Sequence, residues 1–116
     1  MTEQELETVF ERPIAFHRIF FTITRSISAA LLLSQMWYWK DRTRDPDGWF
    51  YKTHREWEQE TGLSRHKQDA ARERLRELGL ISERYKGMRR ALHFRVNGLE
   101  LLEKVNEAIN KKSQAA

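Results

Sequence analysis

Residues 54–81, HREWEQETGLSRHKQDAARERLRELGLI, constrain the fold of this 116-residue chain more than any other stretch. A capping-box pattern at Thr53 predicts the start of one helix, which the glycine at Gly62 would stop. Ser64 is a suitable N-cap for a second helix, which we expect over residues 64–78. The stretch therefore predicts two helices joined by a short turn that contains glycine, a helix-turn-helix arrangement.

A β-hairpin is expected directly after this pair of helices. Residues 81–96 alternate between apolar and polar side chains on either side of the sequence KGMRR, where Gly87 favours a tight turn. Residues 48–53, GWFYKT, predict a further brief strand. Residues 14–24 mix helical and strand periodicities, so either a short strand or a helical turn is expected there.

Three more helices are predicted around this centre. Short amphipathic helices are expected at the ends of the chain, over residues 2–12 and 98–112, followed by a frayed tail. Residues 26–42 form a helix that is apolar nearly all round and must be covered on more than one side. The cover would come from the terminal helices or from a second subunit. With no repeat or linker, we expect a single domain over residues 1–116 with its core in residues 14–97.

The positive charge of the chain gathers in its second half. The net charge is +4, but residues 1–11 carry four Glu and no Lys or Arg. Residues 64–81 hold five basic and three acidic side chains, and residues 82–95 hold five basic and one acidic. Clustered basic residues indicate a polyanionic partner, although solvated surface charge explains them equally well.

The segment ETGLSRHKQDAARERLRELGLI, followed by a hairpin, resembles winged helix-turn-helix domains. The longer frame AALLLSQMWYW…GWFYKTHREWEQETGLSR is similar to small winged-helix proteins of phages, plasmids and integrated elements, and to the N-terminal domains of DnaD-type replisome organisers. The resemblance implies a mostly helical α+β fold that binds double-stranded DNA. Helix 64–78 would read the major groove, and the wing over residues 84–91 would hold the backbone.

One face of helix 64–78 is expected to pack on the preceding helix, together with Trp57 and Leu63. It consists of residues three or four positions apart, namely Gln68, Ala71, Leu75 and Leu78. Gln68 departs from the usual apolar residue, so we expect either a hydrogen bond or partial exposure at this position.

The candidate DNA contacts lie on the first turn and the opposite face of this helix, because residues near its N-terminus usually reach base edges. They are Ser64, Arg65, His66, Lys67, Gln68, Ala70 and Arg74. Arg pairs well with guanine and Gln with adenine, and a small residue such as Ala70 lets the helix approach closely. The competing interpretation is that Arg72, Arg74 and Arg76 form surface salt bridges with Glu73 and Glu77.

For the hairpin, the resemblance implies backbone contacts from Lys86, Arg89 and Arg90, with Arg84 and Arg95 flanking them. Such contacts position a protein on DNA without choosing a sequence. Winged-helix domains also bind proteins, which is the alternative for the same residues.

Several other classes of protein are disfavoured. The absence of cysteine excludes thiolate chemistry, and the four dispersed histidines do not suit a zinc site. No phosphate-binding loop or nucleophile motif is present, so we expect neither an enzyme nor a cofactor. The apolar stretch over residues 26–39 is too short to span a bilayer, and the acidic N-terminus does not resemble a secretory signal. A cytoplasmic location is therefore expected.

Two roles remain open for a DNA-binding protein of this kind. One is a transcriptional regulator of a mobile genetic element, with tight binding to a palindromic site. The other is a replication-initiation or replisome-organising protein, with weaker sequence choice and more assembly. A pure protein-interaction module is a third. A homodimer is expected in which helix 26–42 and the terminal helices form the interface.

Overall fold

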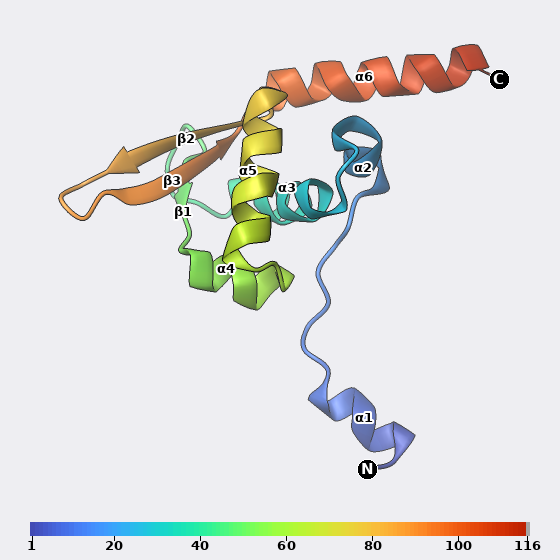
Figure 1. Ribbon diagram of the computed structural model, residues 1–116, viewed down its shortest axis with the longest axis vertical. Coiled ribbons are helices and arrows are strands. Elements are labelled where there is room, and N and C mark those ends of the chain that lie inside the picture. The colour runs from blue at the N-terminus through green and yellow to red at the C-terminus, as the bar shows by residue number, and fades with distance from the viewer. Residues whose placement is uncertain (116) are drawn as a thin grey trace.

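Six helices and three strands follow one another along residues 1–115, which are the residues that the computed structural model describes (Figure 1). The fold is α+β and mostly helical, as predicted. The elements are α1 (Glu3–Val9), α2 (Arg18–Thr24), α3 (Ile27–Lys40), β1 (Phe50–Tyr51), α4 (His54–Thr61), α5 (Arg65–Glu77), β2 (Ile81–Lys86), β3 (Ala91–Val96) and α6 (Gly98–Ala115).

The helix boundaries follow from local capping chemistry. The capping boxes of Thr2 and Thr53 are both formed, and the Ser26 and Ser64 hydroxyls accept hydrogen bonds from the first turns of α3 and α5. Gly62 ends α4 in a left-handed conformation with φ of 77°, which glycine adopts without strain. The predicted pair of helices with a short glycine-containing turn is therefore confirmed.

Of the strand and the helical turn expected over residues 14–24, the helix is observed, because α2 occupies the second part of this stretch. Two other predictions need correction. The N-terminal helix is shorter than the predicted span of 2–12, because α1 ends at Val9. The predicted frayed tail is wrong as well, since α6 continues to Ala115.

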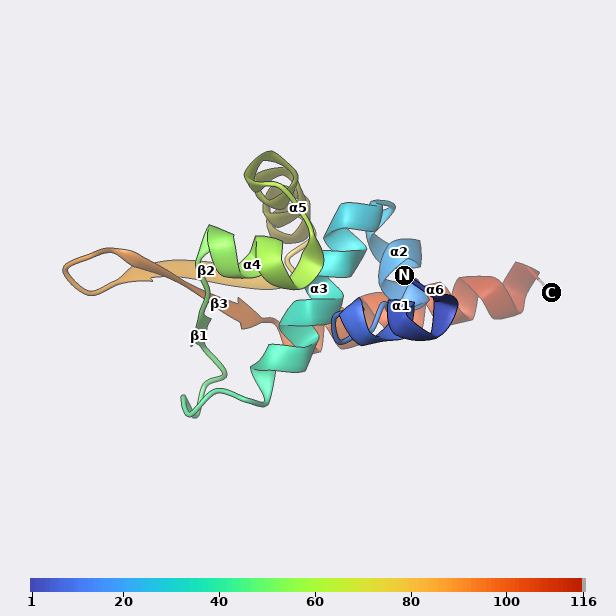
Figure 2. The same cartoon turned by 90° about the horizontal axis from the view of Figure 1, so that it is seen from below.

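The three strands form an antiparallel sheet in the order β1-β3-β2, with β3 at its centre. The register pairs Phe50 with Phe94 and Ile81 with Val96, so these buried side chains share the face that covers the core. The turn between β2 and β3 has two residues in the left-handed region, Gly87 and Arg90. The hairpin projects from one end of the molecule and α6 from the other (Figures 1 and 2).

Helix α3 lies at the centre of the core. It packs against α2, α4, α5 and β3, and its residues from Ala29 to Met36 are buried apart from the half-buried Leu31. Only Ile27 and Trp37 are exposed among its large apolar side chains. The helix is thus covered by its own chain, and the prediction that residues 26–42 form a dimer interface is wrong for most of this segment.

The terminal helices are much less covered. Helix α6 packs on α2 and buries Leu101, but its apolar side chains Leu99, Leu102 and Ile109 are exposed. Helix α1 buries no residue and is separated from α2 by an extended segment (Figure 1). None of the helices within residues 1–115 combines the length and apolarity needed to cross a membrane.

Candidate functional site

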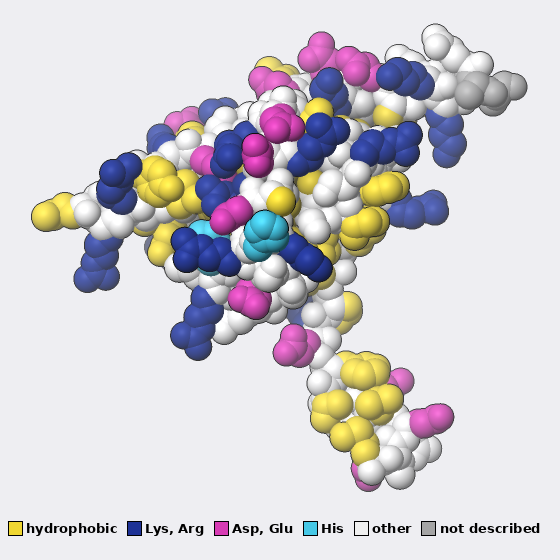
Figure 3. All heavy atoms as spheres, in the orientation of Figure 1, with side chains coloured by type: hydrophobic (Ala, Val, Ile, Leu, Met, Phe, Trp, Pro, Cys, Tyr) yellow, Lys and Arg dark blue, Asp and Glu magenta, His cyan; other side chains and the backbone are white. Residues whose placement is uncertain are grey.

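A groove of about 750 Å³ lies between α5, the start of α4 and the β2–β3 hairpin. Figure 3 shows Lys and Arg side chains spread over the face that α5 and the hairpin present, with acidic side chains between them. Trp57 and Phe94 lie at the base of the groove, since both are buried yet line it. The groove is therefore built on the core rather than on mobile segments.

Besides the buried Gln68, five of the predicted contact residues line this groove. They are Arg65, His66 and Ala70 of α5, and Arg89 and Arg90 of the hairpin turn. All five are exposed. The fold thus brings the first turns of α5 and the hairpin turn to the same groove, a proximity that the sequence alone did not establish.

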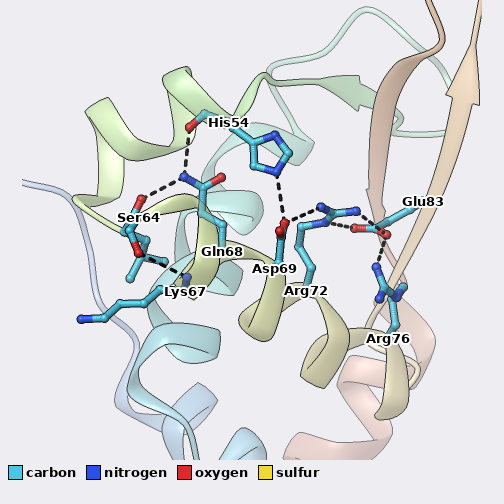
Figure 4. A network of polar contacts seen from close by, with 9 residues as sticks. His54, Ser64, Lys67, Gln68, Asp69, Arg72, Arg76 and Glu83 are labelled. Carbon is cyan, nitrogen blue, oxygen red and sulfur yellow. Dashed lines mark hydrogen bonds and ion pairs between the residues drawn. The ribbon is translucent and has the colours of Figure 1, made fainter.

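Ser64 and Lys67 lie at the start of α5, and neither lines the groove. The Ser64 hydroxyl accepts a hydrogen bond from the backbone amide of Lys67 at 3.3 Å. Ser64 is therefore the N-cap of α5, as predicted. The Lys67 side chain is exposed, and in Figure 4 it points away from the hairpin.

Gln68 is fully buried, so the prediction that its side chain contacts a base is wrong. Its Nε2 donates hydrogen bonds to the carbonyl oxygens of His54 and Leu63, both at 2.9 Å. Buried carbonyl groups need donors, and an apolar side chain could not supply them. Of the two expectations for this position, the hydrogen bond is the one observed, and it fixes α5 against α4.

Arg74 also lies outside the groove. Its Nε donates to the carbonyl oxygen of Thr24 at 2.9 Å, and its Nη1 lies 3.7 Å from a carboxylate oxygen of Glu77. The side chain therefore joins α5 to the end of α2. The pair with Glu77 agrees with the competing interpretation of Arg74 as a surface salt bridge, and the bond to Thr24 gives the side chain a structural role.

Arg72 and Arg76 are also structural, but their partner is not the one predicted. Both donate to Glu83 of β2, with 2.6 Å between Arg72 Nε and Glu83 Oε2 (Figure 4). Arg72 in addition bonds Asp69, which accepts a further contact from His54 at 3.1 Å. The network runs from α4 through α5 to β2 and holds one wall of the groove.

The charges in this network stabilise one another. Burial acts to raise the pKa of Glu83, but the hydrogen bonds from Arg72 and Arg76 outweigh it and bring that pKa below its ordinary value. The hydrogen bond from His54, and then the nearby charges of His54 and Arg72, lower the pKa of Asp69 despite some burial. Both carboxylates are therefore charged near neutral pH.

Lys86 lies apart from the other hairpin residues. It borders a second, smaller hollow on the opposite side of the sheet, together with Arg84 and His93. Strand alternation explains the separation, because Arg84 and Lys86 lie on one face of β2 and Glu83 and Tyr85 on the other.

The sequence reasoning missed several residues that line the main groove, including Tyr51, Lys52, His54 and Tyr85. Tyr85 is exposed, and the Arg90 guanidinium lies 5.0 Å from the centre of its ring. The alternation of the hairpin places Tyr85 beside Leu92, and counting strand positions could have found it.

Within residues 1–115, no group of three or more His, Asp or Glu side chains converges in a way that could hold a metal ion. Comparison of the chain with protein-family models, curated proteins and solved structures finds no match.

Proposed function

We propose that this protein is a winged helix-turn-helix protein that binds double-stranded DNA. Helix α5 enters the major groove, and the tip of the β2–β3 hairpin holds the phosphate backbone. One observation carries the proposal, namely the division of the basic residues into two groups. Arg72, Arg74 and Arg76 have carboxylate partners, whereas Arg65, Arg89 and Arg90, which line the groove from α5 and the hairpin tip, have none within residues 1–115.

Cations without carboxylate partners are available to phosphates, and their neutralisation of DNA charge releases counterions. Arg65 and His66 lie in the first turn of α5, where base contacts are usual in this arrangement. The exposed methyl group of Ala70 lets the helix come close, and apolar contact with a thymine methyl group is compatible with it.

The exposed apolar surfaces support self-association as part of the proposal, now through α6 rather than α3. The exposed stripe on α6 consists of Leu99, Leu102 and Ile109. Acidic residues dominate the first half of the helix, and Lys111 and Lys112 lie in its second half. An antiparallel pair of α6 helices from two copies would place opposite charges side by side and leave both hairpins free.

This arrangement suits a transcriptional regulator of a mobile element, which needs two-fold symmetry for a palindromic site. A replication-initiation protein or a protein-interaction module is the alternative, and the exposed apolar face of α1 favours it. A regulator is expected to choose one DNA sequence and the alternatives are not, so selection from a random duplex library separates them. Recovery of one defined site supports the regulator.

The first test is fluorescence anisotropy of a labelled random-sequence duplex at two salt concentrations. Wild type is expected to bind at about 50 mM salt and to weaken steeply toward about 200 mM. The variant Arg65→Glu/Arg89→Glu should lose binding, whereas the control Arg12→Glu/Arg18→Glu should lose far less. Both control positions are exposed and lie away from the groove. Absence of wild-type binding at low salt would refute DNA as the main partner.

A further inference from the structure

The face of the sheet that points away from the core has an unusual composition. The strand register places Tyr51 beside His93, and His93 beside Arg84 of β2. Strand alternation then adds Lys86 and Arg95 to the same face. Apart from Ser82 and Ala91, this outer face consists of aromatic and basic side chains.

Two aromatic contacts shape the outer face. The rings of Tyr51 and His93 lie 5.5 Å apart with 34° between their planes, and Tyr51 is 48% exposed. The guanidinium of Arg84 lies 4.1 Å from the ring centre of Trp49 in the loop before β1. Together these side chains border a hollow of about 230 Å³.

The cations of the outer face have no carboxylate partner. Arg84, Lys86 and Arg95 of the strands are all exposed, as is Arg44, which borders the hollow from the loop before β1. None of the four forms an ion pair among the residues that the structure describes. The acidic residue that borders this hollow is Asp45, in the turn before β1. One carboxylate oxygen of Asp45 accepts the backbone amides of Asp47 and Trp49, so it is occupied in holding that turn.

This combination differs from the inner side of the hairpin, where Glu83 pairs with Arg72 and Arg76. Like charges gathered without partners repel one another, so the cations of the outer face do not stabilise the fold. They are exposed and do not contribute to the packing of the core. A flat strand surface with an exposed ring between cations suits a ligand that has both planar groups and phosphates. Unstacked bases meet this description, whereas the bases of a duplex are already stacked on each other.

We propose that the outer face of the sheet binds a single strand of DNA. A base stacks on Tyr51 and His93, and the phosphates on either side contact Arg84, Lys86 and Arg95. The proposal goes beyond duplex binding by α5 and does not depend on it. If both hold, the hairpin lies between a duplex in the main groove and an unpaired strand on its outer side.

The test uses fluorescence anisotropy of a labelled oligothymidylate of about 12 nucleotides, within the usual site sizes of single-strand binders. Wild type should bind it at low salt. We expect Tyr51→Thr, which preserves strand propensity, to weaken binding about tenfold, since stacking on one aromatic residue accounts for that much. Arg84→Glu/Lys86→Glu should weaken it further.

The duplex of the previous test separates this proposal from the first. Arg65→Glu/Arg89→Glu should lose the duplex and keep the single strand. Arg84→Glu/Lys86→Glu should do the reverse, because neither residue lines the main groove. Absence of single-strand binding by wild type overturns the single-strand site alone. Equal loss of both ligands in Arg84→Glu/Lys86→Glu also overturns it, because that face would then belong to the duplex interface.

Circular dichroism melting of each variant shows whether it is folded, so that a loss of binding can be attributed to the substituted side chain. If Tyr51→Thr fails to fold, Lys86→Glu alone replaces it, since this exposed side chain lies next to the hairpin turn and forms no hydrogen bond within the described part of the chain. A folded Lys86→Glu protein that binds the single strand as tightly as wild type contradicts the site.

Discussion

Arg72 and Glu83 join α5 to the hairpin through two hydrogen bonds, from Nε at 2.6 Å and from Nη2 at 3.1 Å. This planar, bidentate pair lies where the two walls of the main groove meet. Because Arg76 bonds the same carboxylate, Glu83 ties two positions of α5 to one position of β2.

Replacing Glu83 with Gln should lower the free energy of unfolding by about 2 kcal/mol, because two arginines lose their charged acceptor in a half-buried setting. Urea denaturation measures the change. The matched control is Glu77→Gln, whose exposed pair with Arg74 should contribute less than about 0.5 kcal/mol. Equal effects of the two changes would show that Glu83 is no more important than a surface charge.

Stability should also depend on pH through Glu83 and Glu60. Burial acts to raise the pKa of Glu60, but hydrogen bonds from Lys52, Gln35 and Trp39 outweigh it and bring the pKa below its ordinary value. A carboxylate with a lowered native pKa stabilises the fold above its ordinary value of 4.5. That stabilisation is lost as pH falls from this value through the lower native pKa.

The free energy of unfolding should therefore be nearly constant from about pH 7 to 5 and fall below about pH 4.5. Urea denaturation at several pH values measures this dependence of the free energy of unfolding on pH. The acid-induced loss should be smaller in Glu83→Gln than in wild type, since the variant lacks one of the titrating groups. An identical decline in both proteins would mean that Glu83 does not contribute.

Gln68→Leu should destabilise the protein by about 2 kcal/mol, although leucine is the more apolar residue. The carbonyl oxygens of His54 and Leu63 would lose their donor in a buried environment. Gln68→Glu should be worse, because a carboxylate would lie against two carbonyl oxygens. Thermal melting measures both, with the exposed change Arg65→Ala as a control of little effect. A leucine variant as stable as wild type would show that these hydrogen bonds are dispensable.

Leu102→Glu/Ile109→Glu should dissociate the proposed α6 dimer without unfolding the monomer, because both side chains are already exposed. Sedimentation velocity would show the change in mass, and a melting curve would report the fold. Removal of residues 1–9 is the companion experiment. It should leave the melting temperature nearly unchanged, since α1 buries nothing. A wild-type monomer at high concentration would rule out the α6 interface.

The sequence was most informative where structure depends on neighbouring residues. Capping residues such as Ser64 and stop signals such as Gly62 act within one helical turn, so both helices around them could be located closely. The sequence was less informative about which elements cover an apolar helix. A run such as residues 29–36 shows that cover is needed, but the source of the cover depends on the whole fold.

The errors at the site have a similar origin. Gln68 lies both near the start of α5 and on its packing face, and the sequence does not decide between the two. Glu83 was not recognised as the partner of Arg72, because their contact depends on how the hairpin packs against α5. Lys86 was grouped with Arg89 as one wing, although strand alternation and the turn place them on different sides.

The acidic arm, residues 1–11, gives the chain an uneven distribution of charge. It holds four of the 17 acidic side chains and none of the 21 basic ones, which leaves +8 on the remaining residues. A polyanion attracts one end of such a molecule and repels the other, so it turns the protein during approach. In a complex with DNA the arm would be driven to the outside, where its exposed apolar side chains Leu6, Val9 and Phe10 would face solvent and other proteins.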